Sequence, residues 1–332
     1  MKIYKIVLTV ILGLFINQNK VQAQGTLPIY TDYLSDNIYL VHPSAAGIGS
    51  SGKLRFTHRQ QWTDNDESPA LQTLSIHNRF SEKVGLGLVL FNDKNGYHSQ
   101  KGIQATYAYH LNSGRDDALD QLSFALSASY IQNSVDQRNF TTPDPIISQI
   151  VESDNYFNAD FSIAYHGLDG FLYFTVKNLL LNAQDNATRD YKNINLRRYI
   201  VNTGRFFGWG KSFQIEPSIM IQYVGRTKEK LVDINTKMYK TFGDNKRGFF
   251  ALSYRRSLDN NGTQSLNQIT PILGLEFNKY FVSYTYTHQL GDIIYQNGGF
   301  HQFTLGMKVF SKRNKDRGYI PDYNSFMYKN DN

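Results

Sequence analysis

The chain contains few residue patterns that could support catalysis or metal binding. Its eight histidines are scattered along the sequence, and none forms a close ligand pair such as His-x-His or His-Glu-x-x-His. Serine and histidine are both present, but no Gly-x-Ser-x-Gly nucleophile motif occurs. Cysteine is absent, which excludes disulfides and thiolate metal sites. We therefore predict no catalytic residue, no metal site and no cofactor.

Four charged residues stand on the polar side of segments that alternate between apolar and polar side chains. These residues are Asp160, Glu216, Arg255 and Glu276. A charge in an enclosed interior must pair with an opposite charge or meet water. We therefore expect these side chains to line a hydrated lumen. They would either form salt bridges there, or select or grip something that enters the lumen.

The elements that must position these charges are short segments with a period of two, which is the period of a β-strand. Residues 122–130 and 213–223 show the alternation most clearly. About 14 such segments follow one another between residues 52 and 310, separated by Asn, Asp, Gly and Lys. Pro217 lies within one of them and predicts a bulge or kink. Residues 141–152 break the pattern and predict a loop that carries a short helix, and the two faces of the segment at 198–207 cannot be assigned.

The composition indicates that the strands form a transmembrane barrel. Aromatic residues make up 14% of the chain, with 23 Tyr and 22 Phe, yet no apolar run is long enough for a membrane-spanning helix. One face of most segments is apolar while the other is small or polar, as lipid outside and water inside require. We predict an all-β fold, a transmembrane antiparallel β-barrel of about 14 strands with a short N-terminal helical or plug segment. A soluble β-sandwich is the alternative fold.

The segments outside the predicted barrel suggest export. Residues 1–23 resemble a secretory signal peptide, with Lys2 and Lys5 before a short apolar run and a cleavage site after Ala23. We expect a periplasmic or plug segment at 24–51, the outer-membrane barrel at 52–310 and a basic, aromatic periplasmic tail at 311–332. The net charge of +7 is spread along the chain, so nucleic acid is not an expected partner.

One stretch carries a family resemblance, from Pro28 to Trp62. Aromatic residues recur in it at helical spacing, a Pro-Ser-Ala-Ala-Gly turn follows at 43–47, and a strand then ends in Arg-Gln-Gln-Trp at 59–62. This combination resembles the start of the PorP/SprF family, outer-membrane proteins of the type IX secretion and gliding systems of Bacteroidota. His42 stands where the family usually has Asn, and the alanines are displaced. Beyond these residues the resemblance is one of strand rhythm and length.

The resemblance implies a non-enzymatic outer-membrane component of type IX secretion. It would assist the export or surface anchoring of an adhesin-like cargo protein with a type IX C-terminal signal domain. It would also contact periplasmic, peptidoglycan-associated components, in addition to outer-membrane lipid. The residues expected to bind a partner or to plug the barrel are Pro28, Tyr30, Tyr33, Asn37, Pro43, Ala46, Gly47, Arg59, Gln60, Gln61 and Trp62. The alternative function is that of a generic porin or small-solute channel with the N-terminal stretch as its plug.

Overall fold

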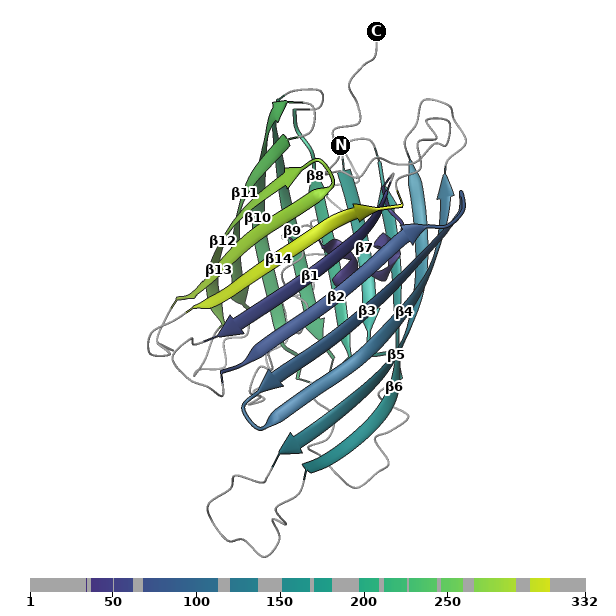
Figure 1. Cartoon of the computed structure of the whole chain (residues 1–332), viewed down its shortest axis with the longest axis vertical. Helices are drawn as coiled ribbons and strands as arrows, with labels where there is room; N and C mark the ends of the chain where they lie inside the picture. The colour runs from purple at the N-terminus through teal and green to yellow at the C-terminus, as the bar shows by residue number, and fades with distance from the viewer. Residues whose placement is uncertain are drawn as a thin grey trace, which may run out of the picture.

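The chain, seen in a computed structural model, forms a closed barrel of antiparallel strands (Figure 1). The strands are β1 (Gly52–Gln61), β2 (Ala70–Arg79), β3 (Val84–Asn95), β4 (His98–Asn112), β5 (Gln121–Asp136), β6 (Val151–His166), β7 (Gly170–Lys177), β8 (Arg198–Arg205), β9 (Phe213–Val224), β10 (Lys230–Gly243), β11 (Lys246–Ser257), β12 (Asn267–Phe277), β13 (Tyr280–Gln289) and β14 (Phe300–Val309). The predicted barrel of about 14 strands is therefore confirmed.

The structure describes residues 34, 37–49, 51–61, 68–112, 120–136, 151–167, 170–180, 197–208, 212–225, 227–243, 246–258, 266–290 and 299–310. Each strand pairs with its neighbours in sequence, and β14 closes on β1 from Gly52↔Val309 to Gln61↔Phe300. A closed barrel has no unpaired strand edge, as lipid requires. None of the helices within the described ranges has the length and apolar character needed to cross a membrane.

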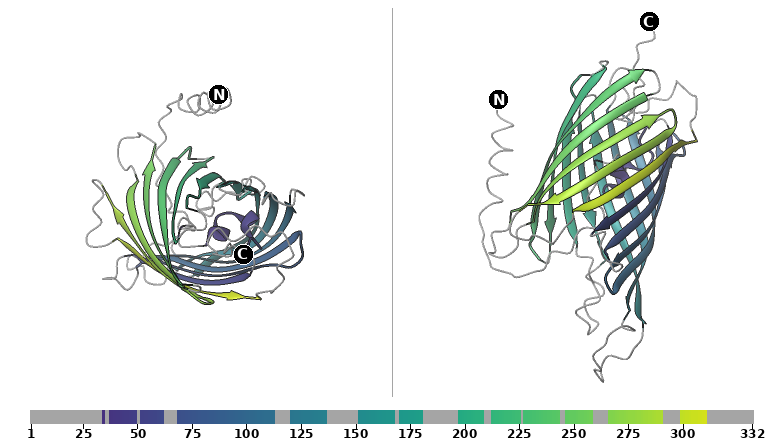
Figure 2. Two further views of the ribbon diagram at one scale, coloured as in Figure 1. Left: turned by 90° about the horizontal axis from the view of Figure 1, so that it is seen from above. Right: turned by 60° about the vertical axis from the view of Figure 1, so that its left-hand side comes forward.

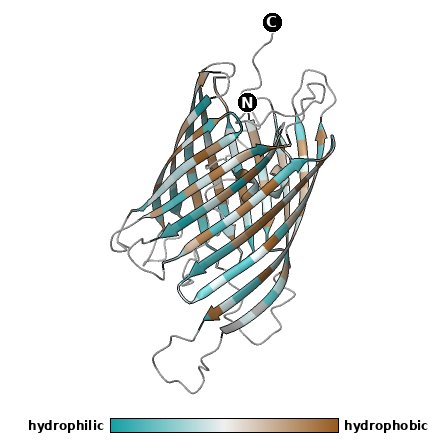
Figure 3. Cartoon of the chain, in the orientation of Figure 1, coloured by the Kyte–Doolittle hydropathy of each residue, from teal (hydrophilic) through white to brown (hydrophobic). Residues whose placement is uncertain are grey.

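The two faces of the strands differ as the alternating sequence predicts. On β5 the large apolar side chains Leu122, Leu126 and Tyr130 are exposed on the outer face, whereas Ser123 and Ser127 between them are buried on the inner face. Figure 3 shows the same alternation of hydrophobic and hydrophilic residues along many strands. The sequence left the faces of β8 open, and the structure directs Ile200 and Asn202 inward. The outer surface therefore suits lipid and the inner one suits polar groups.

The lengths of the connections distinguish the two ends of the barrel. Where β1 begins and β14 ends, no connection between strands is longer than eight residues, and the shortest are at 244–245 and 278–279. The opposite end also has one short connection, at 96–97. The longest connections, at 137–150 and 178–197, lie at the opposite end. Outer-membrane barrels have short periplasmic turns and longer extracellular loops. We infer that the end at Gly52 is periplasmic, and we name the two ends accordingly.

The bulge predicted at Pro217 does not form. Strand β9 pairs with β10 in one continuous register that includes Thr236↔Pro217. The ladder between β9 and β8 stops at Gly204↔Ser218 and resumes in the same register with the bridge between Phe207 and Ile215. The proline, which has no N–H to donate, therefore costs a local gap in one ladder instead of an inserted residue.

The described part of the N-terminal stretch contains two short 3₁₀ helices, η2 (Ile38–Leu40) and η3 (Pro43–Ala45), and Pro43 begins the second of them. Most of residues 28–36, where the helical spacing begins, lie outside the described residues. Proline is tolerated at a helix start because its missing N–H has no partner there in any case. Of the predicted loop at 141–152, residues 141–150 lie outside the described residues and residues 151–152 belong to β6. The predicted signal peptide and tail, at 1–23 and 311–332, are outside them as well.

Candidate functional site: the lumen and its inner segment

Residues 37–49, which we call the inner segment, lie inside the barrel. The view along the barrel shows η2 and η3 surrounded by strands (Figure 2, left). Every residue of the inner segment is buried except Ile38 and Leu40, which are partly buried. Because the strands of the wall surround it, the burial of these residues depends on the barrel being closed.

Polar side chains of the inner segment bind the wall at β2 and β4. Asn37 Nδ2 donates a hydrogen bond to Ser75 Oγ at 2.9 Å, and the Tyr39 hydroxyl donates to Thr106 Oγ1 at 2.9 Å. Burial raises the pKa of Tyr39, so the phenol keeps the proton that it donates. Each of these bonds satisfies a buried polar group that would otherwise be costly to enclose.

A chain of hydroxyl groups joins η3 to β6 and β7. Ser44 Oγ lies 2.7 Å from Ser162 Oγ, which lies 2.7 Å from Thr175 Oγ1, and His42 Nδ1 lies 2.7 Å from the same threonine oxygen. The His42 ring also stacks on Tyr173, with the ring centroids 4.7 Å apart. The residue before η3 and its middle residue are thus fixed to one patch of wall.

Two histidines of the wall hold the backbone of the inner segment, and both must be neutral to do so. The Gly47 amide donates to His77 Nδ1 at 3.0 Å, so this nitrogen carries no proton. His110 Nε2 lies 3.0 Å from the Ala46 carbonyl oxygen and therefore donates to it. The amide of Gln121 donates to His110 Nδ1 at 3.0 Å, which leaves that nitrogen unprotonated. These hydrogen bonds therefore require one particular neutral tautomer of each histidine ring.

Two glycines of β3 allow the inner segment to approach the wall closely. A Cβ atom at Gly85 would collide with the Ala46 carbonyl oxygen and would lie 2.8 Å from His110 Nε2. A Cβ atom at Gly87 would collide with the Tyr39 hydroxyl. The alternating glycines within the 84–90 segment therefore have a packing role, which is to leave space for the inner segment.

Replacing Gly85 by alanine should weaken docking of the inner segment by about 1–3 kcal/mol, since the added methyl group overpacks a backbone contact. Hydrogen exchange of the amides of residues 37–49 measures this as faster exchange while the barrel amides stay protected. Gly225→Ala is the matched control, because a Cβ atom there meets only ordinary contacts at 3.7 Å. Equal exchange in both variants would contradict the packing role of Gly85.

Docking of the inner segment should also depend on pH through His42. Burial, with smaller contributions from Lys177 and His166, lowers the pKa of His42 well below its ordinary 6.5. A released segment would take up a proton near pH 6.5, whereas the docked one stays neutral. Docking is therefore strongest above pH 6.5, and this contribution is lost as pH falls below it, by up to about 1.4 kcal/mol per pH unit. Hydrogen exchange of the inner segment between about pH 7.5 and 5 tests this, and His42→Gln should reduce the dependence; an identical pH profile in this variant would contradict it.

A contiguous cluster of buried apolar side chains crosses the lumen from the inner segment to the part of the barrel formed by β10–β13 and β1, which we call the far wall. It contains Tyr39, Val41 and Ala45 of the inner segment together with Phe249 of β11 and Ile272 of β12. The sequence predicted a hydrated lumen and did not indicate these inward aromatic residues. At this level the interior is packed like a protein core instead.

The far wall combines cations with aromatic rings. The Arg55 guanidinium lies 4.5 Å from the centre of the Phe281 ring, and Lys237 Nζ lies 4.1 Å from that of Phe249. The two rings stack on each other with centroids 6.0 Å apart. Cation–π contacts of this kind partly compensate a buried charge for lost water.

The structure places all four predicted lumen charges on the inner face. They lie on four different strands, Asp160 on β6, Glu216 on β9, Arg255 on β11 and Glu276 on β12. Asp160 Oδ2 lies 3.8 Å from Lys177 Nζ, which also donates to the Leu40 carbonyl oxygen of the inner segment at 2.9 Å. Glu276 forms ion pairs with Arg247 (3.7 Å) and with Lys308.

The other two predicted charges have partners on a neighbouring strand. Arg255 binds Asp233 through two hydrogen bonds of 2.6 Å, from Nε to Oδ1 and from Nη2 to Oδ2. Glu216 Oε2 accepts a hydrogen bond of 2.5 Å from the Tyr239 hydroxyl. Sequence reasoning missed Asp233, although its period-two position within 230–243 is the same signal that identified Glu216.

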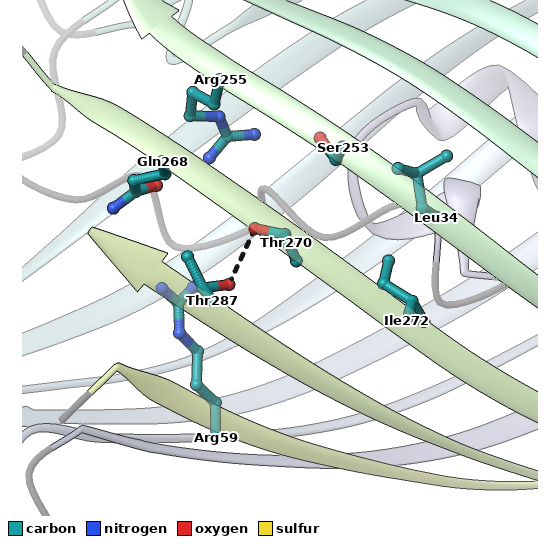
Figure 4. Close-up of a pocket in the computed structure, with 8 residues that line it drawn as sticks. All are labelled: Leu34, Arg59, Ser253, Arg255, Gln268, Thr270, Ile272 and Thr287. Carbon is teal, nitrogen blue, oxygen red and sulfur yellow. Dashed lines mark hydrogen bonds between the residues drawn. The ribbon is translucent and has the colours of Figure 1, made fainter. Parts of the chain in front are cut away.

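A small pocket lies on the extracellular half of the far wall (Figure 4). It is lined by Leu34, Arg59, Ser253, Arg255, Gln268, Thr270, Ile272 and Thr287. A hydrogen bond of 3.0 Å joins Thr270 to Thr287 across it. Two arginines and several amide and hydroxyl groups make this surface rich in hydrogen-bond donors.

Among the described residues no group of three or more His, Cys, Asp or Glu side chains is arranged to hold a metal ion.

Sequence comparison places these features in a known family. The profile of the family described as type IX secretion system membrane protein PorP/SprF matches residues 21–307. The chain belongs to this family. A PorP/SprF protein is a membrane component of type IX secretion, and its closed antiparallel β-barrel is the architecture of an outer-membrane protein. A search of curated protein sequences finds no significant match.

Several solved structures are similar to this PorP/SprF chain at very low sequence identity. The outer membrane protein Omp33 of Acinetobacter baumannii is 7% identical with a TM-score of 0.44, and the match covers 79% of this chain and 99% of that one. A FadL homologue of Pseudomonas aeruginosa is 8% identical with a TM-score of 0.46, over 78% and 89% of the two chains. The KdgM porin is 8% identical with a TM-score of 0.36, over 77% and 98%.

The residues of the PorP/SprF resemblance fall into three groups in the structure. Pro28, Tyr30, Tyr33 and Trp62 lie outside the described residues. Asn37, Pro43, Ala46 and Gly47 belong to the buried inner segment. Arg59, Gln60 and Gln61 belong to β1.

Neighbouring side chains of the Arg-Gln-Gln motif lie on opposite faces of β1. Arg59 and Gln61 are buried on the inner face of β1, and the Arg59 guanidinium lies 4.2 Å from the centre of the Phe300 ring. Gln60 lies between them on the outer face, together with Phe56. Of the two amides, only Gln61 therefore faces the lumen, where it can join a polar network.

Proposed function

We propose that this PorP/SprF protein is a closed, non-enzymatic outer-membrane barrel that assists the export or surface anchoring of a secreted cargo protein. The cargo is an adhesin-like protein with a type IX C-terminal signal domain. On the periplasmic side the barrel contacts peptidoglycan-associated components of the secretion machinery. The inner segment acts as a plug and leaves the wall when the machinery or the cargo engages the barrel.

The docking of the inner segment is the observation that carries this proposal. Hydrogen bonds tie it to β2, β4, β6 and β7, and an apolar cluster joins it to the far wall. A lumen closed in this way suits a protein that works by binding partners better than one that passes solutes continuously.

The position of the plug supports a periplasmic trigger. The inner segment leads directly into β1, which begins at Gly52 on the end that we infer to be periplasmic. Gly47 packs against the backbone of Arg79 and Gly85, at the periplasmic ends of β2 and β3. A partner bound at this rim, where the inner segment joins β1, could displace the plug without entering the barrel.

A pull-down from native outer membranes in mild detergent, followed by mass spectrometry, tests the proposal. Recovery of a large secreted protein or of periplasmic secretion components is the expected result. Recovery of the barrel alone, with steady ion conductance of the unmodified protein in a lipid bilayer, would overturn it. That outcome would favour the alternative function of a small-solute channel.

Replacing Arg59 by alanine should reduce cargo secretion by about tenfold, if loss of the guanidinium that lines the pocket removes about 1–2 kcal/mol of partner binding. Arg59 lines the pocket of the lumen and is positioned by Phe300. Gln60→Ala is the matched control, since Gln60 is its outward neighbour. Normal insertion of the Arg59 variant with unchanged secretion would contradict this role.

A further inference from the structure

We propose that the lumen of this barrel becomes an anion-selective pathway when the inner segment leaves the wall. The ligand class is small inorganic anions such as chloride. The proposal concerns ion flow through the barrel alone and does not depend on the secretory role. The inner segment would then be the gate of this pathway as well as a plug.

The charges of the lumen favour anions. Among the described residues, seven buried basic side chains stand against three buried acidic ones. The basic residues are Lys53, Arg55, Arg59, Arg79, Lys237, Arg247 and Arg255, and the acidic ones are Asp160, Glu216 and Asp233. A pathway with surplus charge of one sign, between walls of low dielectric constant, concentrates counter-ions of the opposite sign.

Each of the three buried acidic residues has a close partner. Asp233 accepts two hydrogen bonds of 2.6 Å from two nitrogens of Arg255, and Asp160 accepts one of 2.8 Å from Gln104 and lies 3.8 Å from Lys177. Glu216 accepts a hydrogen bond of 2.5 Å from Tyr239. The ten buried charged side chains together carry a net charge of +4, and this surplus sets the sign of the field along the lumen.

The arrangement of these cations matches a route beside the inner segment. The hydrogen bonds of the inner segment go to β2, β4, β6 and β7. Six of the seven buried basic side chains lie elsewhere, on β1, β10 and β11. Loss of the inner segment would therefore open space against the basic wall.

Tyr39 offers the simplest way to open the gate. Its ring is 3% exposed, packs on Gly87, donates a hydrogen bond to Thr106 and belongs to the cluster that crosses the lumen. Tyr39→Ala removes all of these contacts without altering the barrel wall. A disulfide between Cys replacements of Ser44 and Ser162 would hold the same segment in place, because the two hydroxyl oxygens are 2.7 Å apart.

Conductance of the purified full chain in planar lipid bilayers, under a potassium chloride gradient, tests the proposal. Tyr39→Ala should conduct, with a chloride-to-potassium permeability ratio of at least about three. Adding the two cysteine replacements to this variant should abolish the current under oxidising conditions and restore it on reduction. Since this comparison uses one protein in two states, a folding defect cannot imitate it.

The charge argument has its own control. Lys53→Gln with Lys237→Gln, in the Tyr39→Ala background, should lower the permeability ratio toward one, whereas Lys101→Gln with Lys240→Gln on the exposed face should leave it unchanged. A cation-selective current, or a ratio that both pairs change equally, would overturn the anion preference. Absence of current in Tyr39→Ala, or a current that ignores the disulfide, would overturn the gate.

Discussion

Cargo export should fall by at least about tenfold when Ser44 and Ser162 are both replaced by cysteine and oxidised, and should recover on reduction. The two hydroxyl oxygens lie 2.7 Å apart, so their Cβ atoms are near enough for a disulfide. The chain has no cysteine of its own, so this bond would be its sole disulfide. It would prevent the movement of the inner segment that we propose to accompany export.

The control for this experiment is a second serine pair that does not involve the inner segment. Ser99 of β4 and Ser134 of β5 have hydroxyl oxygens 2.6 Å apart, and a disulfide there joins two strands that are already paired. Export should be unaffected by it. If the Ser44–Ser162 disulfide forms completely and export continues at its normal rate, the inner segment does not need to move.

Replacing Asp233 by asparagine should lower the free energy of unfolding of the barrel by about 3–5 kcal/mol. Asp233 is 1% exposed and accepts two hydrogen bonds of 2.6 Å from Arg255. Asparagine has nearly the same shape but leaves the buried guanidinium without its counter-charge. The loss reflects that stranded charge more than the net contribution of the ion pair.

Equilibrium unfolding in urea, from detergent micelles or lipid vesicles, measures this loss. Arg256→Gln is the matched control, because Arg256 is the exposed neighbour of Arg255 on the outer face of β11, and its effect should stay within about 0.5 kcal/mol. Asp233→Leu combined with Arg255→Leu should regain much of the stability, since neither charge of this pair is then left buried without its partner. A cost below about 1 kcal/mol for the asparagine variant would show that water reaches the pair.

The architecture of the barrel follows from local sequence. In residues 122–130 and 213–223 each apolar side chain alternates with a small or polar one, and this period of two specifies both a strand and its two faces. The composition, rich in tyrosine and phenylalanine, indicates that the apolar face meets lipid. The resemblance over Pro28 to Trp62 likewise depends on a short contiguous stretch, so it identified the PorP/SprF family before any contact was known.

Only the tertiary structure decided which groups meet in the lumen. Asp233 and Arg255 face each other because β10 and β11 pair in one particular register. Where a long connection joins two strands, as at 137–150 and 178–197, the sequence does not indicate the register of the pair. Ser44 contacts Ser162, 118 residues later in the sequence. Such contacts arise when the barrel closes around the inner segment, and a local pattern holds no information about which wall that segment will touch.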